Sequence, residues 1–280
     1  MTNQYNSNPL IEDEDITPFD RIQVAHFIPA IKHTMAIGKN NLRIIIESKE
    51  TPNVSNTILP LELHAQDLYR IVDIYFVLYG VHSDDKYKKL SEKISPMMAE
   101  YNNDIILNET LFKKVKYIYD HASDLNLDGE ELRLTQETYN KFIKNGSLLD
   151  TDQKIKLREI DKELSALKPK FTQNLLNATK KYELHISSHK QVQGIPESVL
   201  ETAAAKAKEK DDDGWIFTLD APVYTPVMTY AEDRILREKM HRAFNSRANG
   251  GEFSNKNILK RITTLRNERA ILLGLESHAH

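Results

Sequence analysis

Histidines are the side chains of this sequence best suited to hold a metal ion. His185 and His189 have the spacing of His-Glu-x-x-His zinc sites, but the pattern itself is absent because no Glu lies between them. The segment from Tyr182 to Ser187 alternates apolar and polar residues, which predicts a strand. Residues four apart in a strand lie about 13 Å from each other, too far to share an ion. We therefore interpret this pair, like His278 and His280, as surface residues.

The segment from Asp124 to Gly129 matches the first half of an EF-hand calcium loop. The twelfth position of such a loop should be a bidentate Glu, but here it is Thr135, and the usually apolar eighth position is Glu131. The missing Glu removes one of the strongest oxygen ligands. We therefore predict no calcium site and expect a turn that caps a helix starting near Glu130.

Arginines gather near the end of the sequence, at Arg234, Arg237, Arg242, Arg247, Arg261, Arg266 and Arg269. A guanidinium fork suits carboxylates, so carboxylate binding is one interpretation. Ion pairs within the protein are the other, favoured because Glu232, Asp233, Glu238 and Glu268 are interleaved. No Gly-rich phosphate loop or Gly-x-Ser-x-Gly elbow occurs, and the absence of Cys excludes a thiol nucleophile or thiolate metal site.

The composition is that of a globular protein. With 280 residues, 40% of them hydrophobic, the chain has enough apolar side chains for a sizeable core. The formal net charge of -3 does not suggest a nucleic-acid partner. The longest apolar run, Ile74 to Val81, is too short to cross a membrane, and the first residues do not resemble a signal peptide. We therefore expect a soluble, cytoplasmic protein with no membrane partner.

Helical periodicity dominates the first part of the chain. One stripe predicts a helix from Thr151 to Tyr182, with a capping box of Asp150 and Gln153 at its start and a bend or break at Pro169. A second stripe, from Tyr87 to Ile105, contains Pro96 and predicts one kinked helix or two abutting helices. Other helical signals are first-turn prolines at Pro29 and Pro60 and a helix from Glu130 to Ile143 that ends at Asn145-Gly146.

The pattern changes after Lys181. Two short strands are predicted, at Tyr182–Ser187 and Trp215–Leu219. Between and after them we expect a turn at 194–197 leading into an Ala-rich helix, a turn at 211–214, an irregular stretch around Pro222 and Pro226, and helices over 230–247 and 254–273. The predicted fold class is mainly α, multi-helical, with one small two-strand β element.

One stretch is more specific than these signals. The run from Trp215 to Pro226 is followed by Tyr230–Lys239, then by Arg247, Asn257 and Leu265–Gly274. This order resembles the N-terminal half of the M3 family of zinc metallopeptidases, the thimet-oligopeptidase-like enzymes. Further matches in the family's order are Pro18-Phe19-Asp20, His26–Ala30, Asn56-Thr57-Ile58, Leu61-Glu62, Asn108, Leu111-Phe112, Leu164, Leu167, Phe171, Asn174 and Gly194–Glu197. Within the family the chain is most similar to peptidyl-dipeptidase (dipeptidyl carboxypeptidase), then to oligopeptidase A.

The resemblance implies a peptide hydrolase whose catalytic residues lie outside this chain. In the family, the zinc-binding helix, the third ligand and the transition-state residues belong to the second half. We therefore assign no catalytic, cofactor-binding or metal residue here and expect zinc only in the complete enzyme. The implied organisation is a polar tail over 1–15, a helical channel wall over 16–182, a β and irregular insert with a short helix over 183–229, and two helices over 230–280 that lead into a missing C-terminal catalytic half.

Three hypotheses from different classes follow, one of which is a purely structural or assembly role. The first is the N-terminal, channel-forming portion of a zinc-dependent oligopeptidase, inactive alone, whose partners are its own catalytic half and short peptides. The alternative is a stand-alone peptide- or partner-binding module with a peptidase-like scaffold. A stop codon directly after His280 would favour the alternative. The first function also predicts that removal of the second half exposes Leu265, Leu272 and Leu273.

Overall fold

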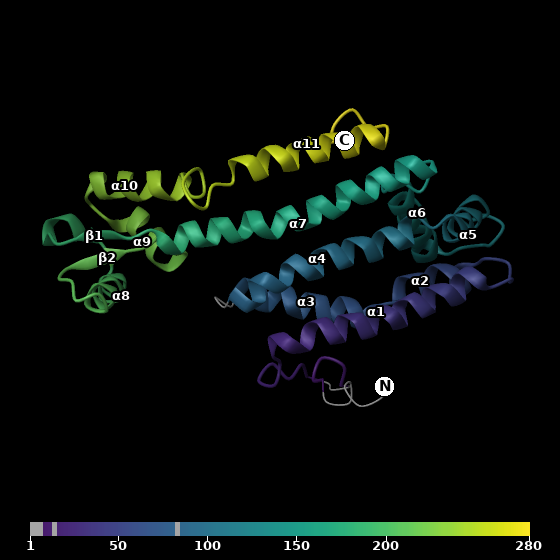
Figure 1. The fold of residues 1–280 in the computed structure, drawn as a ribbon, viewed down its shortest axis with the longest axis horizontal. Helices are drawn as coiled ribbons and strands as arrows, with labels where there is room; N and C mark the ends of the chain where they lie inside the picture. Colours follow the sequence, from purple (N-terminus) through teal and green to yellow (C-terminus); the bar gives the residue numbers. More distant parts are fainter. Residues whose placement is uncertain (1–7, 13–15, 82–84) are drawn as a thin grey trace. The chain divides into compact units, whose positions relative to one another are not determined.

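The fold is mainly helical, as predicted (Figure 1). The computed structural model describes residues 8–12, 16–81 and 85–280. It divides into two compact units, unit 1 with Met1–Ala166 and Leu265–His280, and unit 2 with Leu167–Thr264. Among the described residues, none of the helices combines the length and apolar character that a bilayer crossing requires.

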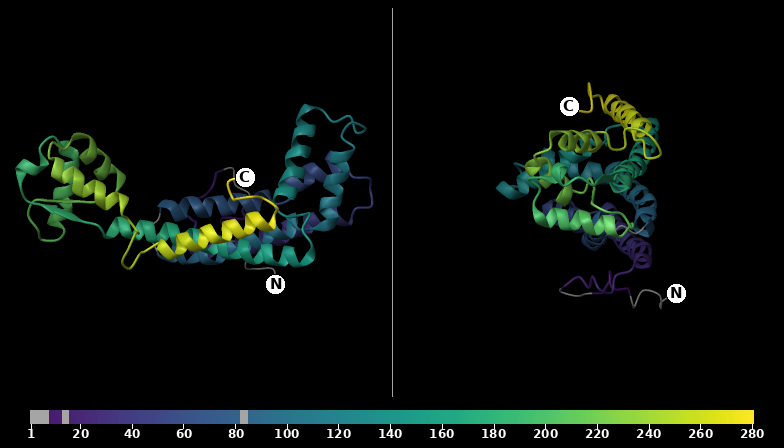
Figure 2. Two further views of the ribbon diagram at one scale, coloured as in Figure 1. Left: turned by 90° about the horizontal axis from the view of Figure 1, so that it is seen from above. Right: turned by 90° about the vertical axis from the view of Figure 1, so that its left-hand side faces the viewer.

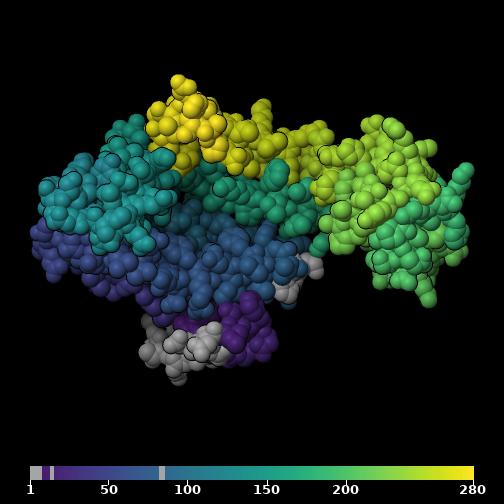
Figure 3. All heavy atoms as spheres, turned by 180° about the vertical axis from the view of Figure 1, so that it is seen from behind, coloured from purple at the N-terminus to yellow at the C-terminus, as the bar shows by residue number. Residues whose placement is uncertain are grey.

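Unit 1 is built around the first helices of the chain. In order they are α1 (Val24–Glu47), the π-helical turn η1 (Val54–Ile58), α2 (Leu59–Leu63), α3 (Gln66–Val81), α4 (Asp85–Ile106), α5 (Glu109–Asp120), α6 (Gly129–Lys144) and the first part of α7 (Thr151–Lys181). Helix α1 packs against α3 and α4, and α5 packs against α6. Their apolar stripes bury one core, in which Phe27 meets Tyr75 edge-on at a centroid distance of 5.3 Å. In Figure 3 the atoms of these helices, purple to teal, form one continuous surface.

Local caps determine where the helices of unit 1 begin and end. The Asp128 carboxylate accepts the amides of Glu130 and Glu131 at 3.0 and 2.8 Å, which confirms the predicted capping turn before α6. Asp150 and Gln153 form the predicted capping box, with hydrogen bonds of 3.1 and 2.8 Å. Gly146 follows α6 with φ +98°, a backbone conformation that favours glycine.

Prolines inside these helices do not end them, although a proline in a helix interior was expected to bend or break the helix. Pro60 lies in the first turn of α2, as predicted, but Pro29 lies inside α1, so that prediction was wrong. Pro96 and Pro169 both lie within single continuous helices, α4 and α7. A proline in a helix interior costs about 3 kcal/mol. In α4, burial of Ile94 and Tyr101 on either side of Pro96 provides the compensating packing free energy.

Unit 2 contains the predicted two-strand β element. Strands β1 (Leu184–Ile186) and β2 (Trp215–Phe217) pair antiparallel, with Leu184 opposite Phe217 and Ile186 opposite Trp215. Gly214, with φ +89°, lies against the Ile186 carbonyl where a Cβ atom would clash. The remaining elements are the 3₁₀ turn η2 (His189–Val192), α8 (Glu197–Lys208), α9 (Ala221–Tyr230), α10 (Arg234–Asn245) and the first part of α11 (Lys256–Leu272), coloured green to yellow in Figure 2.

Helix α9 corrects a second prediction, since residues around Pro222 and Pro226 are helical and not irregular. Pro222 lies in the first turn, where its missing N–H costs nothing, and Pro226 removes one further hydrogen bond. Burial of Val223 and Val227 in the core of unit 2 outweighs that loss. Helix α10 starts later than predicted, at Arg234, because Asp233 caps it by accepting the amides of Ile235 and Leu236 at 2.7 and 3.2 Å.

The apolar residues of α11 are less exposed than predicted. Leu265 is only 1% exposed, and Leu272 and Leu273 are partly buried against the core of unit 1. The expectation of exposure is therefore wrong for Leu265, whereas Leu272 and Leu273 remain partly exposed. The physical reason is that the C-terminal part of α11 belongs to unit 1, where Leu272 and Leu273 pack against the core and Arg269 bonds to Asp161 of α7.

Candidate functional site

Three of the histidines considered as metal ligands contact other residues of the chain. His185 Nε2 lies 2.5 Å from the Asp213 carbonyl and 3.6 Å from Asp212 Oδ1. The His189 ring packs edge-on against Trp215 at a centroid distance of 4.8 Å. At the chain end, His280 Nε2 lies 3.7 Å from Glu276 Oε2.

The described residues do not provide a set of ligands for a zinc ion. A structural zinc site needs four ligands, and a catalytic one needs three from the protein. Nowhere in the described ranges do three or more His, Asp or Glu side chains come together in a geometry that could hold a metal. In the former calcium-loop segment, both the Asp128 and Glu131 carboxylates are engaged in capping α6.

The C-terminal arginines separate into different classes once their contacts are known. Arg242 pairs with Glu238 at 2.8 Å, and Arg269 pairs with Asp161 at 2.8 Å. Arg237 Nη1 donates to the carbonyls of Ala231 and Glu232. The favoured prediction of ion pairs within the protein thus holds for Arg242 and Arg269.

Arg247 differs from Arg242 and Arg269 because it forms no ion pair with any carboxylate in the described part of the chain. Its Nε donates to the Phe244 carbonyl at 2.8 Å and its Nη1 to Thr179 Oγ1 at 3.2 Å. Its guanidinium carbon lies 3.5 Å from the centroid of the Phe244 ring, a cation–π contact. Partial burial lowers the pKa of Arg247 below its usual value.

A pocket of about 380 Å³ in unit 2, called here the Arg247 pocket, surrounds this side chain. Its lining residues are Ala178, Lys181, Tyr182, Leu219, Ala243, Ser246, Arg247, Ala248, Gly250, Gly251, Glu252 and Phe253. Sequence reasoning named Arg247 only as one of many arginines. Nothing in its neighbourhood along the chain distinguishes it, because Tyr182 and Leu219 come from distant segments.

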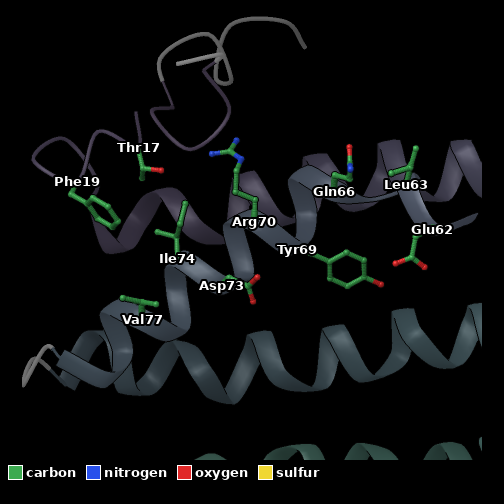
Figure 4. A pocket seen from close by; sticks show the side chains of 10 residues that line it. All are labelled: Thr17, Phe19, Glu62, Leu63, Gln66, Tyr69, Arg70, Asp73, Ile74 and Val77. Carbon is green, nitrogen blue, oxygen red and sulfur yellow. The ribbon is translucent and has the colours of Figure 1, made fainter. Parts of the chain in front are cut away.

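A second hollow, called here the α3 groove, lies in unit 1 and has a volume of about 590 Å³. Its side chains come from the segment before α1, from α2 and from α3 (Figure 4): Thr17, Phe19, Glu62, Leu63, Gln66, Tyr69, Arg70, Asp73, Ile74 and Val77. Phe19 and Val77 are 54% and 59% exposed, so the groove presents apolar side chains to solvent. Arg70 Nη2 donates to the Leu10 carbonyl at 3.1 Å, and Tyr69 donates to Asn102 Oδ1 at 3.2 Å.

The α3 groove was not predicted, although the sequence contains a pattern that indicates exposed apolar side chains there. The run from Ile74 to Val81 is apolar around the whole helix, and such a helix cannot bury every side chain against one core. Phe76, Val77 and Val81 are accordingly exposed, while Ile74, Tyr75 and Leu78 are buried.

The chain is similar in sequence to known oligopeptidases and a dipeptidyl carboxypeptidase. It is 31% identical over 288 residues to the organellar oligopeptidase A of Arabidopsis thaliana, which covers 98% of this chain and 35% of the relative. It is 31% identical over 263 residues to the dipeptidyl carboxypeptidase of Escherichia coli, covering 93% of this chain and 39% of the relative. Oligopeptidase A of Escherichia coli is 29% identical over 278 residues, covering 98% and 41%. No family model matches the chain.

These matches show that the chain is related to oligopeptidases. The expected resemblance is confirmed: the chain is a homologue of the M3-family oligopeptidase A and dipeptidyl carboxypeptidase enzymes, and the match is consistent with their N-terminal portion. The chain spans only 35% to 41% of the length of these relatives.

Proposed function

We propose that this chain is the N-terminal, channel-forming portion of a zinc-dependent oligopeptidase of the peptidyl-dipeptidase type, which hydrolyses short peptides. The single observation that supports this most is the similarity along 98% of the chain to proteins named oligopeptidase A. In this proposal the chain works in the cytoplasm, and its partners are the C-terminal catalytic half of the same protein and short peptides.

By itself the chain is catalytically inactive in this proposal. Hydrolysis at a zinc centre needs three protein ligands and a general base arranged around one ion. The described histidines and carboxylates do not converge in that way. The ligands, the general base and the zinc ion are therefore assigned to the catalytic half.

The contribution of this chain is to bind and enclose the peptide. Long helices supply rigid walls, and the 31-residue α7 is the longest among the described elements. The exposed apolar side chains of the α3 groove suit contact with an unfolded peptide, whose apolar side chains are accessible. A channel between such walls and the catalytic half would admit short peptides and exclude folded proteins.

The test is a peptidase assay on the purified chain. A short quenched fluorescent peptide with added zinc should show no chelator-sensitive hydrolysis, and metal analysis should show no stoichiometric zinc. Co-expression with the proposed C-terminal catalytic half should then give hydrolysis that a chelator abolishes. One tightly bound zinc per isolated chain, or turnover without the added part, contradicts the proposal.

A further inference from the structure

We propose that the Arg247 pocket binds the C-terminal carboxylate of a short peptide, with the last side chain of the peptide against the apolar wall of the pocket. This inference rests on the proposed function and specifies which end of the peptide this chain holds. It is carried by four features of the pocket: an arginine without a carboxylate partner among the described residues, the fixed orientation of that arginine, backbone amides without a described acceptor, and an apolar wall.

The first feature is the unused hydrogen-bonding capacity of Arg247. Two of its nitrogens donate to neutral protein oxygens, while Nη2 has no acceptor within the described residues. A half-buried guanidinium normally has a carboxylate partner, because the charge loses hydration when it is buried. Arg269 in unit 1 shows that normal case, with its Nε 2.8 Å from Asp161. Arg247 therefore has the capacity for an anionic partner that the chain itself does not supply.

The second feature is the fixed orientation of the guanidinium. Its plane is held over the Phe244 ring at 3.5 Å, and Phe244 stacks on Tyr224 at a centroid distance of 4.0 Å and an interplanar angle of 12°. The two hydrogen bonds to Phe244 and Thr179 restrain it further. A carboxylate would therefore meet a guanidinium fork that is already oriented, which reduces the entropy lost on binding.

The third feature is the glycine loop beside Arg247. Gly250 and Gly251 line the pocket, and their amide N–H groups donate to no acceptor in the described part of the chain. Hydrogen bonds from Asn255 N to the Ala248 carbonyl at 2.7 Å and from Ser254 N to the Gly251 carbonyl at 3.3 Å hold the loop. Free amides of this kind bind anions when they converge on one.

The fourth feature is the balance of charge and apolar surface. Lys181 and Glu252 also line the pocket but pair with each other at 2.8 Å, so Arg247 supplies the net positive charge. Tyr182, Leu219 and Phe253 give the pocket an apolar wall. A volume of about 380 Å³ lies at the lower end of the range for small-ligand sites, which suits one or two amino-acid residues. This wall favours a peptide carboxylate over inorganic phosphate.

The experiment compares ligands by the shifts of the Gly250 and Gly251 amide signals in NMR spectra of the isotope-labelled chain. N-acetyl-Ala-Leu with a free carboxylate should shift both signals saturably, and the same dipeptide with a C-terminal amide should not. Arg247→Gln should weaken binding of the acid roughly ten- to hundredfold, the range expected for one charge-assisted hydrogen-bonded pair. Arg247→Lys, which keeps the charge without the fork, should weaken it less than Arg247→Gln does.

The matched control is Arg242→Gln, which removes an arginine that pairs with Glu238 on the exposed face of α10. It should leave the affinity unchanged. Further ligands are N-acetyl-Glu with a C-terminal amide, which carries only a side-chain carboxylate, and inorganic phosphate; both should bind more weakly than the dipeptide acid. The proposal is overturned if the dipeptide amide, N-acetyl-Glu amide or inorganic phosphate binds as tightly as the dipeptide acid. This comparison uses the original protein, so it does not depend on whether the variants fold.

Failure of this inference is distinguishable from failure of the proposed function. The dipeptide experiment needs only the isolated chain and reports a binding site. The peptidase assay needs the catalytic half and reports hydrolysis. Hydrolysis in the co-expressed protein together with no binding of the dipeptide acid would leave the proposed function in place and overturn only the carboxylate site.

Discussion

Arg269 Nε donates to Asp161 Oδ1 at 2.8 Å, and the two side chains are only 21% and 18% exposed. The residues are 108 positions apart in the sequence, and the bond joins α11 to α7 within unit 1. Arg269 Nη2 also donates to Asn145 Oδ1, at 2.9 Å, just after the end of α6. One arginine thus holds three helix segments together with charge-assisted and neutral hydrogen bonds.

Replacement of this arginine should measurably destabilise unit 1. Arg269→Gln leaves the Asp161 carboxylate partly buried without its cation, and we expect a loss of about 1.5–3 kcal/mol in the free energy of unfolding. Arg242→Gln is the control, because the Arg242–Glu238 pair is exposed and worth about 0.5 kcal/mol or less. Urea unfolding followed by circular dichroism gives both values. Equal losses in the two variants would contradict the assigned role of Arg269.

Gly38 marks a close approach between helices. It lies inside α1, where an added Cβ would clash with the Tyr101 hydroxyl and lie 3.1 Å from Ala65 Cβ. Gly38→Ala should therefore destabilise the protein by about 1–3 kcal/mol, despite the higher helix propensity of Ala. Gly80→Ala in α3 meets no atom within 4 Å and should be neutral or stabilising by up to about 1 kcal/mol. Thermal unfolding of both variants tests the contrast.

Tyr101 allows a second test of the same contact. Its hydroxyl is buried without a hydrogen-bond partner in the described residues, while its ring stacks on His64 at 5.9 Å. Tyr101→Phe should therefore be neutral or stabilising, since it removes an unsatisfied polar group. In the Tyr101→Phe background, Gly38→Ala should cost less than in the original protein. Simple additivity in this double-mutant cycle would show that the hydroxyl is not the obstacle.

His64 should make stability depend on pH. Burial lowers its pKa below the ordinary 6.5, and the positive charge of Lys141 acts in the same direction, although the hydrogen bond with Leu61 opposes them. The unfolded chain therefore binds a proton more readily than the folded one, so this contribution to stability is complete above about pH 6.5 and is lost as the pH falls below it.

The comparison variant is His64→Asn, in which the side-chain amide can replace the His64 Nδ1 contact with the Leu61 carbonyl, 2.5 Å long in the original protein. Between pH 7.5 and pH 5.5 the original protein should lose more unfolding free energy in urea than the variant does. An equal loss in the two proteins would show that His64 does not cause the pH dependence.

Leu265 and Ile271 give a matched pair on α11. Leu265 is 1% exposed and Ile271 is 62% exposed. Leu265→Ala should cost about 2–5 kcal/mol, as expected for a buried leucine, and Ile271→Ala about 0.5 kcal/mol or less. Differential scanning calorimetry measures both. Equal melting temperatures for the two variants would contradict the burial of Leu265 in the folded chain.

Local structure followed the sequence wherever the signal lay within a few residues. Asp128 and Asp150 start α6 and α7 because their side chains bond to amides two or three residues further on. Gly274, with φ +75°, follows the last helix for an equally local reason. The predictions failed at Pro29 and Pro226, where packing of neighbouring apolar residues outweighs the local cost of a proline.

The sequence by itself therefore determined the mainly α fold, the two-strand element and the relationship to the M3 oligopeptidases. Only the tertiary structure decided that Arg247 has no carboxylate partner among the described residues and that Leu265 is buried. Nothing near Arg242 and Arg247 in the sequence distinguishes their environments. Arg242 pairs with Glu238 one helical turn away, whereas Arg247 contacts distant segments of the chain, for example at Thr179. Hydrogen-bond pairing and burial depend on distances in space, and chain neighbours set those distances only within one element.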